Sequence, residues 1–162
     1  MISEKFDNFK YSCKILKRKI MSPLLKNIIA VIIGIIVGII VNMGIILISG
    51  YIIPLPEGVD PADPQSLKDG MHLFEFKHFI LPFLAHALGT LAGAFTAVKL
   101  GASQFITIAW IITGFFMIGG IYSAWQIQGP YWFTVIDLTF AYMPMGLLGW
   151  VWGRKKVVPV KE

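Results

Sequence analysis

The sequence places one carboxylate deep within an apolar stretch, and this residue is the first candidate for chemistry. Asp137 is the only acidic residue well inside any of the long apolar segments. An ionised carboxylate that faces hydrocarbon is costly, so Asp137 is expected to face other helices and to meet hydrogen-bond donors there. Intramembrane acids often handle protons, ions or ligands, but a purely structural pair with His86 is an equally supported interpretation.

Two more polar side chains reach a similar depth in other apolar segments. At a helical rise of about 1.5 Å per residue, Asp137 lies about 9 Å inside its segment, and His86 lies about 12 Å beyond His78. By the same count, Asn42 lies about 14 Å inside the first apolar segment. We therefore predict a polar binding cluster made of Asp137, His86, Asn42, Thr90 and His78. Thr113 and Tyr142 are expected about one turn deeper, as further donors.

A line of residues at four-residue steps could place two of these side chains on the wall of a cavity. His78, Pro82, His86 and Thr90 lie on the same broad side of one helix. Pro82 has no amide hydrogen for the carbonyl of His78, so we expect a kink there. For His86 alone, a hydrogen-bonded interior histidine without a ligand is the simpler interpretation.

Three residues of metal-ligand type stand near the start of the second apolar segment. His72, Glu75 and His78 suit zinc, but a helix turns by about 240° between the two histidines, so one ion cannot meet all three. Helix capping or contact with lipid headgroups is the better-supported role. Haem ligation would need a second chain, because His78 and His86 lie on one helix. We predict no metal site, no cofactor and no catalytic residue.

The composition is that of a chain dissolved in lipid. Of 162 residues, 56% are hydrophobic and 14% are charged, and the mean hydropathy is +0.73. Apolar segments and short turns use almost the whole length, which leaves no room for a separate soluble catalytic domain. The single cysteine, Cys13, excludes an intrachain disulfide and dithiol chemistry.

Four apolar segments are long enough to cross a hydrocarbon core of about 30 Å as helices. The turn between the second and third is so short that these two must be antiparallel neighbours. We predict an all-α integral membrane four-helix bundle with spans at about 27–53, 73–99, 103–125 and 131–152 and an external loop at 54–72. This domain, 27–153, is expected to lie between a basic amphipathic tail, 1–26, and a second basic tail, 154–162.

The basic residues are distributed unevenly about these predicted spans. Twelve of the fourteen Lys and Arg lie on the side of both termini, and only Lys68 and Lys77 lie on the other. The positive-inside rule therefore predicts that both termini are cytoplasmic in a multi-pass protein of the cytoplasmic membrane. Contact of the tails with anionic lipid headgroups explains the formal net charge of +5, so nucleic acid is not predicted as a partner.

Small residues recur at four-residue steps on the first two spans. The first stripe comprises Gly34, Gly38 and Asn42, and the second comprises Ala85, Gly89, Gly93 and Ala97. Such spacing lets membrane helices approach closely, so both stripes are predicted to be helix interfaces without chemistry of their own.

Three runs of residues, NMGIILISGYIIPLPEGVDP, HFILPFLAHALGTLAGA and YWFTVIDLTFAYMPM, carry a resemblance. Through them, residues 27–153 resemble an uncharacterised family of small four-span bacterial inner-membrane proteins. The resemblance implies the four-span architecture but no activity, since none is attached to that family. It marks Asn42, His78, His86 and Asp137 as motif residues without assigned roles.

Three kinds of function fit these features. The first is an accessory or self-associating bundle with a buried polar cluster, alone as a homo-oligomer or within a larger membrane complex. The second is a homodimeric small transporter or proton-coupled carrier that uses Asp137, although small multidrug carriers have their lone acid in the first span and not the last. The third is a membrane enzyme acting on lipid or quinone, with His86 and Asp137 as an acid/base pair.

Overall fold

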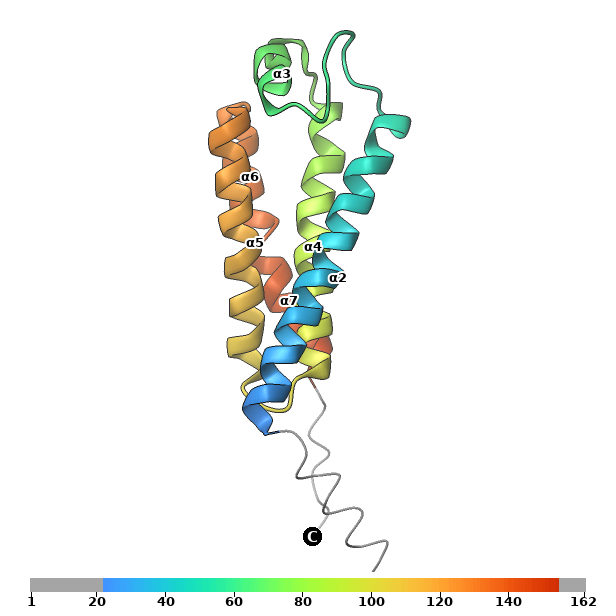
Figure 1. The fold of residues 1–162 in the computed structure, drawn as a ribbon. Coiled ribbons are helices and arrows are strands. Elements are labelled where there is room, and N and C mark those ends of the chain that lie inside the picture. Colours follow the sequence, from blue (N-terminus) through green and yellow to red (C-terminus); the bar gives the residue numbers. More distant parts are fainter. Residues whose placement is uncertain (1–21, 155–162) are drawn as a thin grey trace, which may run out of the picture.

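The computed structural model describes residues 22–154, and every regular element in this part of the chain is a helix. The elements are α2 (Pro23–Ile52), α3 (Pro64–Asp69), the 3₁₀ turn η1 (Gly70–Leu73), α4 (Lys77–Leu100), α5 (Phe105–Ile127), α6 (Tyr131–Phe140) and α7 (Met143–Gly153) (Figure 1). Helices α2, α4 and α5 and the α6–α7 pair are each long and apolar enough to cross a membrane. The predicted all-α class with four such helices is confirmed. Cys13 and most of the two predicted tails lie outside the described residues.

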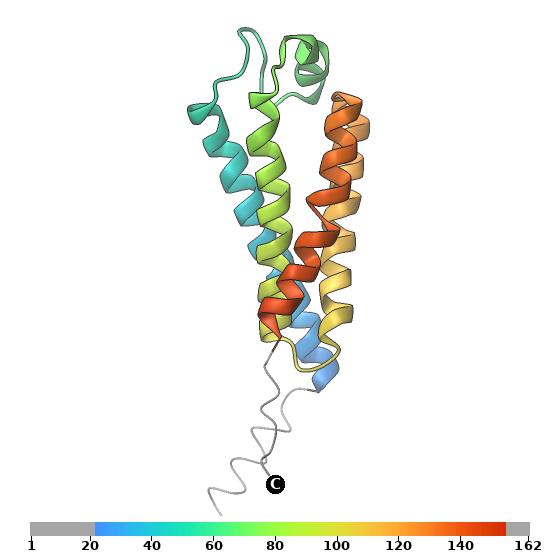
Figure 2. The same cartoon turned by 180° about the vertical axis from the view of Figure 1, so that it is seen from behind.

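The four long helices form one bundle, with α4 in contact with each of the others. The end of the bundle that carries Ser22 and Arg154 is termed the terminal end, and the opposite end, with residues 53–76, is termed the loop end (Figures 1 and 2). α2, α5, α6 and α7 all pack on α4, so α4 is the central helix of the bundle.

Two helices begin at residues other than those predicted, and each has a local cause. α2 begins at Pro23 rather than near residue 27, because the Ser22 hydroxyl accepts a hydrogen bond from the Leu25 amide (3.2 Å) and proline suits a first helical turn. α4 begins at Lys77 rather than near residue 73, because Gly70–Leu73 form the separate η1 turn.

The two predicted small-residue stripes pack against each other and join α2 to α4. A Cβ atom added at Gly34 would lie 2.6 Å from the Cβ of Ala97 and 2.7 Å from the carbonyl oxygen of Gly93. One added at Gly89 would lie 2.9 Å from the Cβ of Asn42. Distances this short leave no room for a side chain, so the two backbones approach only because the stripe residues are small.

α2 is tied down at the terminal end and stands apart at the loop end. The Asn27 amide group donates to the Ser103 hydroxyl (3.2 Å), and its oxygen accepts from the Ala102 amide (2.8 Å). From there α2 crosses α4 and moves away from α5 toward the loop end (Figures 1 and 2). The buried residues of α2 all precede Met43, so the last turns of the helix have little protein around them.

The fourth span is broken in its middle, whereas the sequence predicted one continuous span at 131–152. α6 ends at Phe140 and α7 begins at Met143. Pro144 has no amide hydrogen for the carbonyl of Phe140, and its ring would crowd that carbonyl, so proline favours an interruption of the helix just before this point. α4, in contrast, runs as one helix through Pro82, where the kink was expected.

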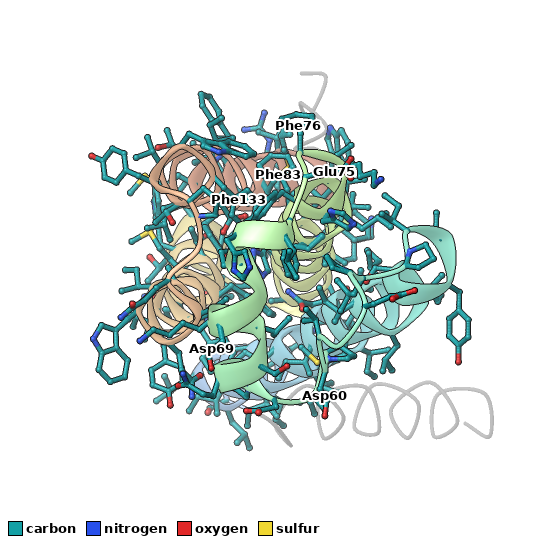
Figure 3. The ribbon with its side chains drawn as sticks, turned by 90° about the horizontal axis from the view of Figure 1, so that it is seen from above. Asp60, Asp69, Glu75, Phe76, Phe83 and Phe133 are labelled. Atoms are coloured by element: carbon teal, nitrogen blue, oxygen red, sulfur yellow. The ribbon has the colours of Figure 1, made fainter. Side chains whose placement is uncertain are left out.

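Aromatic side chains hold α6 against α4 near the loop end. Figure 3 looks down on this end, where α3 crosses the bundle and Phe76, Phe83 and Phe133 lie on the side at which α4 meets α6. The ring of Phe79 lies 4.8 Å from that of Phe133 and 5.3 Å from that of Trp132, measured between centroids. These contacts fix the height and rotation of α6, the helix that carries Asp137.

Candidate functional site

The carboxylate of Asp137 points into the bundle and makes the contact with His86 that the sequence left open. Asp137 is 4% exposed, and both its carboxylate oxygens lie 2.9 Å from Nδ1 of His86. The hydroxyl of Tyr142 donates a second hydrogen bond to Oδ2 (3.2 Å). Residues from α4, α6 and the α6–α7 break thus form one cluster, named the carboxylate cluster and consisting of His86, Asp137 and Tyr142, in which Asp137 and Tyr142 are buried and His86 is partly buried.

The hydrogen bonds of this cluster determine which ring nitrogen of His86 is free to bind a ligand. An ionised Asp137 only accepts hydrogen bonds, so Nδ1 of His86 must carry a proton when it contacts that carboxylate. Nε2 is then the ring nitrogen left for a ligand, as an acceptor when the imidazole is neutral and as a donor when it is charged. A carboxylate that fixes the ring and tautomer of a histidine in this way is a recurring arrangement in binding and catalytic sites.

Tyr142 owes its position to the break in the fourth span. It is 1% exposed and occupies the residue before α7, so its side chain leaves the chain where the helix is interrupted. Its ring stacks on that of His86 with 5.8 Å between centroids, and its hydroxyl lies against Gly120 of α5. A side chain at position 120 would occupy the space of the hydroxyl. From the sequence, Tyr142 was predicted only as a further donor about one turn deeper. Pro144, which follows the break in the fourth span, was the sequence signal that could have placed Tyr142 beside Asp137.

Thr90 and His78, both predicted in the cluster, have other partners. The Thr90 hydroxyl donates to the backbone carbonyl of His86 (2.8 Å), within α4 and away from the carboxylate. Nδ1 of His78 accepts from the backbone amide of Glu75 (2.8 Å), one of the amides that the start of a helix leaves unpaired. Eight residues along a helix separate His78 from His86 by about 12 Å, so His78 caps the helix and lies outside the cluster.

The other residues of metal-ligand type near His78 also have separate partners. The carboxylate of Glu75 pairs with Lys77 (3.0 Å), and Nδ1 of His72 lies 2.9 Å from the carbonyl oxygen of Asp69. Within residues 22–154, no three His, Cys, Asp or Glu side chains are grouped so that they could hold one metal ion.

A half-open cleft of about 520 Å³, termed the cavity, lies between α2 and α5, with His86 and Tyr142 of the carboxylate cluster in its wall. His86, Tyr142 and Asn42 line it together with Ser123. The remaining lining residues are apolar, aromatic or glycine and come from α2 and α5: Ile39, Met43, Phe115, Phe116, Ile118, Gly119, Gly120 and Tyr122. Several of these are also exposed on the outer surface of the bundle, so the cavity opens on that surface and not only along the bundle axis.

Asn42 reaches this cavity but not the carboxylate. It is buried at 8% exposure, and its Cβ packs on Gly89 of α4 as part of the first stripe. The depth count predicted Asn42, His86 and Asp137 at one level, and the contact between His86 and Asp137 agrees with it. In the structure, His86 and Asp137 form a hydrogen-bonded pair, and His86 and Asn42 line the cavity.

Replacement of Tyr142 by phenylalanine should destabilise the protein by about 1 kcal/mol, because Asp137 loses one of its two donors; hydrogen bonds between membrane helices are worth about 0.6–1.7 kcal/mol. The free energy of unfolding can be measured by titration with sodium dodecyl sulfate, followed by circular dichroism. Tyr131→Phe is the matched control, because Tyr131 is 84% exposed. Equal stability of the two variants would contradict the hydrogen bond to Asp137.

Comparison of this chain with protein-family models, with curated proteins and with solved structures gives no match. The geometry of the carboxylate cluster and of the cavity beside it therefore carries the evidence for a function.

Proposed function

We propose that this chain is a small accessory protein of the bacterial cytoplasmic membrane that binds a molecule dissolved in the bilayer. The observation that carries the proposal is the cavity of about 520 Å³, whose wall contains the polar side chains of Asn42, His86 and Tyr142. Its volume falls in the range of about 300–1,000 Å³ that is usual for ligand sites. A few fixed polar groups in an otherwise apolar wall are also typical of such sites.

The position of the cavity favours a ligand that arrives from the membrane. Ile118 is 69% exposed and Met43 is 51% exposed, yet both line the cavity. These side chains face lipid in a chain whose long helices cross the bilayer, so the opening between them admits molecules that diffuse in the membrane. The asymmetry of the basic residues supports cytoplasmic termini, which would place the loop end on the outer face.

The carboxylate cluster supports binding because it prepares His86 for a partner. Partly buried and paired with Asp137, the imidazole cannot rotate freely, so its second nitrogen points in one direction. A site that is ordered before the ligand arrives loses less entropy on binding. In this proposal Asp137 is a positioning residue, and His86 and Asn42 contact the ligand.

Native mass spectrometry in mild detergent tests the proposal by reporting copy number and any bound lipid, small molecule or protein. Gly119 lines the cavity, and a Cβ added there would meet no atom within 4 Å. Gly119→Leu should therefore fill cavity space without disturbing the fold, and the bound mass seen in the unaltered protein should fall at least about tenfold, the effect of 1.4 kcal/mol.

Gly114→Leu is the matched control for this experiment. Gly114 lies on the same helix and is equally open, but it does not line the cavity, so its variant should keep the bound mass. A bound mass that survives in Gly119→Leu, or that is absent from the unaltered protein extracted directly from membranes, would refute the proposal.

A proton-coupled carrier, working as a homodimer, is the second candidate, and one observation favours it. Both hydrogen-bond partners of Asp137, His86 and Tyr142, line the cavity. A proton gained or lost by the cluster therefore changes the hydrogen-bonding groups that the cavity wall presents to a ligand. For a carrier, binding should depend on pH, and Asp137→Asn should abolish that dependence. For an accessory binding protein, Asp137→Asn should leave the fold and the bound partner in place.

A further inference from the structure

The cavity wall offers no unpaired charge to a ligand, because a charged His86 would already be paired with Asp137. Among the described residues that line it there is no Lys, Arg, Asp or Glu. Asp137 lies behind His86 and Tyr142, which already satisfy its carboxylate. A phosphate or an ammonium group in the cavity would be an uncompensated charge at membrane depth, which costs several kcal/mol or more. The part of the ligand inside the cavity must therefore be uncharged.

The wall formed by α5 is rich in aromatic side chains. Phe115, Phe116 and Tyr122 line this side, and the rings of Phe115 and Phe116 meet edge to face with 5.4 Å between centroids. Gly119, with open space above its Cα, lies between these aromatic residues in the sequence. Aromatic side chains gain energy from stacking or edge contacts with another ring, which a flexible acyl chain does not provide.

The polar end of the cavity matches an oxygen atom that can accept or donate a hydrogen bond. Nε2 of His86 donates when the imidazole is charged and accepts when it is neutral, and the Asn42 side chain has both a donor and an acceptor. Both residues line the cavity. A ring carbonyl would accept from these groups, and a ring hydroxyl would donate to them.

The mouth of the cavity suits a hydrocarbon tail. Ile39, Met43 and Ile118 line the opening and are exposed on the outer surface of the bundle. A tail attached to a ring in the cavity would pass between these side chains into the lipid, without leaving an apolar environment.

We infer that the cavity binds an uncharged, lipid-dissolved molecule whose flat ring carries carbonyl or hydroxyl oxygens, the chemical class of the isoprenoid quinones. This inference rests on the proposed function and specifies its ligand. The ring lies against the aromatic wall of α5, one oxygen meets His86 and Asn42, and the tail extends into the bilayer.

Photolabelling of the full chain in lipid nanodiscs tests this inference. The probe is a short-chain benzoquinone with a diazirine on its tail, and the labelled peptides are identified by mass spectrometry. Labelling is expected within residues 39–43 and 115–123, and an excess of unlabelled short-chain benzoquinone should compete it away. A phosphatidylcholine with a diazirine on its acyl chain is the parallel probe.

Two variants that keep the packing locate the polar contact. Asn42→Ala retains the Cβ that packs on Gly89, and His86→Gln retains a donor and an acceptor near Asp137. Each should reduce competable labelling about tenfold, the effect of one lost hydrogen bond of about 1.4 kcal/mol. Gln126→Ala and His72→Gln remove matching groups from exposed positions and should change nothing.

The outcomes separate this inference from the proposed function. Equal labelling of the unaltered protein, Asn42→Ala and His86→Gln would overturn the inference. If the phosphatidylcholine probe labels the cavity peptides and the benzoquinone probe does not, and Gly119→Leu blocks that label, the quinone class is wrong and the binding function stands. If neither probe labels these peptides, the inference is wrong, and the bound mass seen by native mass spectrometry in the unaltered protein and in Gly119→Leu decides the binding function.

Discussion

Replacing Gly34 with valine is expected to destabilise the protein by about 3 kcal/mol, the upper end for overpacking, because the new Cβ would meet the Cβ of Ala97 and the backbone of Gly93. Backbone atoms cannot move aside as a flexible side chain can, so α2 must separate from α4. The free energy of unfolding in a titration with sodium dodecyl sulfate measures this loss. Bound ligand should be lost as well, since α2 supplies one wall of the cavity.

Gly44→Val is the control, because it makes the same change on the same helix. A Cβ at Gly44 would meet nothing within 4 Å, so stability should stay within about 0.5 kcal/mol of the unaltered protein, as for ordinary surface changes. If Gly34→Val were as stable as Gly44→Val, the stripe-to-stripe contact between α2 and α4 would be wrong.

Asp137→Leu should destabilise the protein by about 3 kcal/mol, because Nδ1 of His86 and the hydroxyl of Tyr142 would both lose their acceptor in a buried place. Each unsatisfied buried polar group costs about 1–3 kcal/mol. The same titration with sodium dodecyl sulfate measures the effect. Asp137→Asn, which keeps the volume and an acceptor oxygen, should cost less than half as much.

A double-mutant cycle isolates the contact between the acid and the imidazole. His86→Leu combined with Asp137→Leu removes both partners, and replacing a buried pair by apolar residues is often nearly neutral. The double variant should therefore be more stable than the sum of the single changes predicts, by about 1–2 kcal/mol. Strict additivity would mean that the 2.9 Å contact contributes nothing to stability.

Hydropathy and small-residue spacing predicted much of the architecture. In lipid, the backbone must satisfy its own hydrogen bonds, so long apolar runs form helices whatever their β-branched content. The stripes on α2 and α4 identified a real interface, because close approach of two helices admits only small residues there. Counting residues from the helix ends also placed Asp137 and His86 at one depth, and the two side chains are in contact.

Other parts of the site depend on how the helices end and how they are tilted relative to one another, which the sequence of one segment does not determine. The break before Pro144 turns Tyr142 inward, and its contact with Asp137 depends on where α6 ends. The cavity depends on the tilt of α2 relative to α5, which packing on α4 sets. His78 lies two four-residue steps before His86 on α4, a spacing that predicted both on one side of the helix. Its side chain instead accepts a hydrogen bond from the amide of Glu75 at the start of α4.

Because the loop-end half of α2 stands apart from the other helices, the width of the cavity entrance depends on the thickness of the bilayer. α2 has 30 residues and is about 45 Å long, whereas the hydrocarbon core is about 30 Å thick. Such a helix must lean to keep its apolar residues in lipid, and it leans further in a thinner bilayer. Since Asn27 and the glycine contacts hold the other half, leaning moves Met43 and the turns beyond it relative to α5. Membranes of different lipid chain length should therefore set different widths for the entrance.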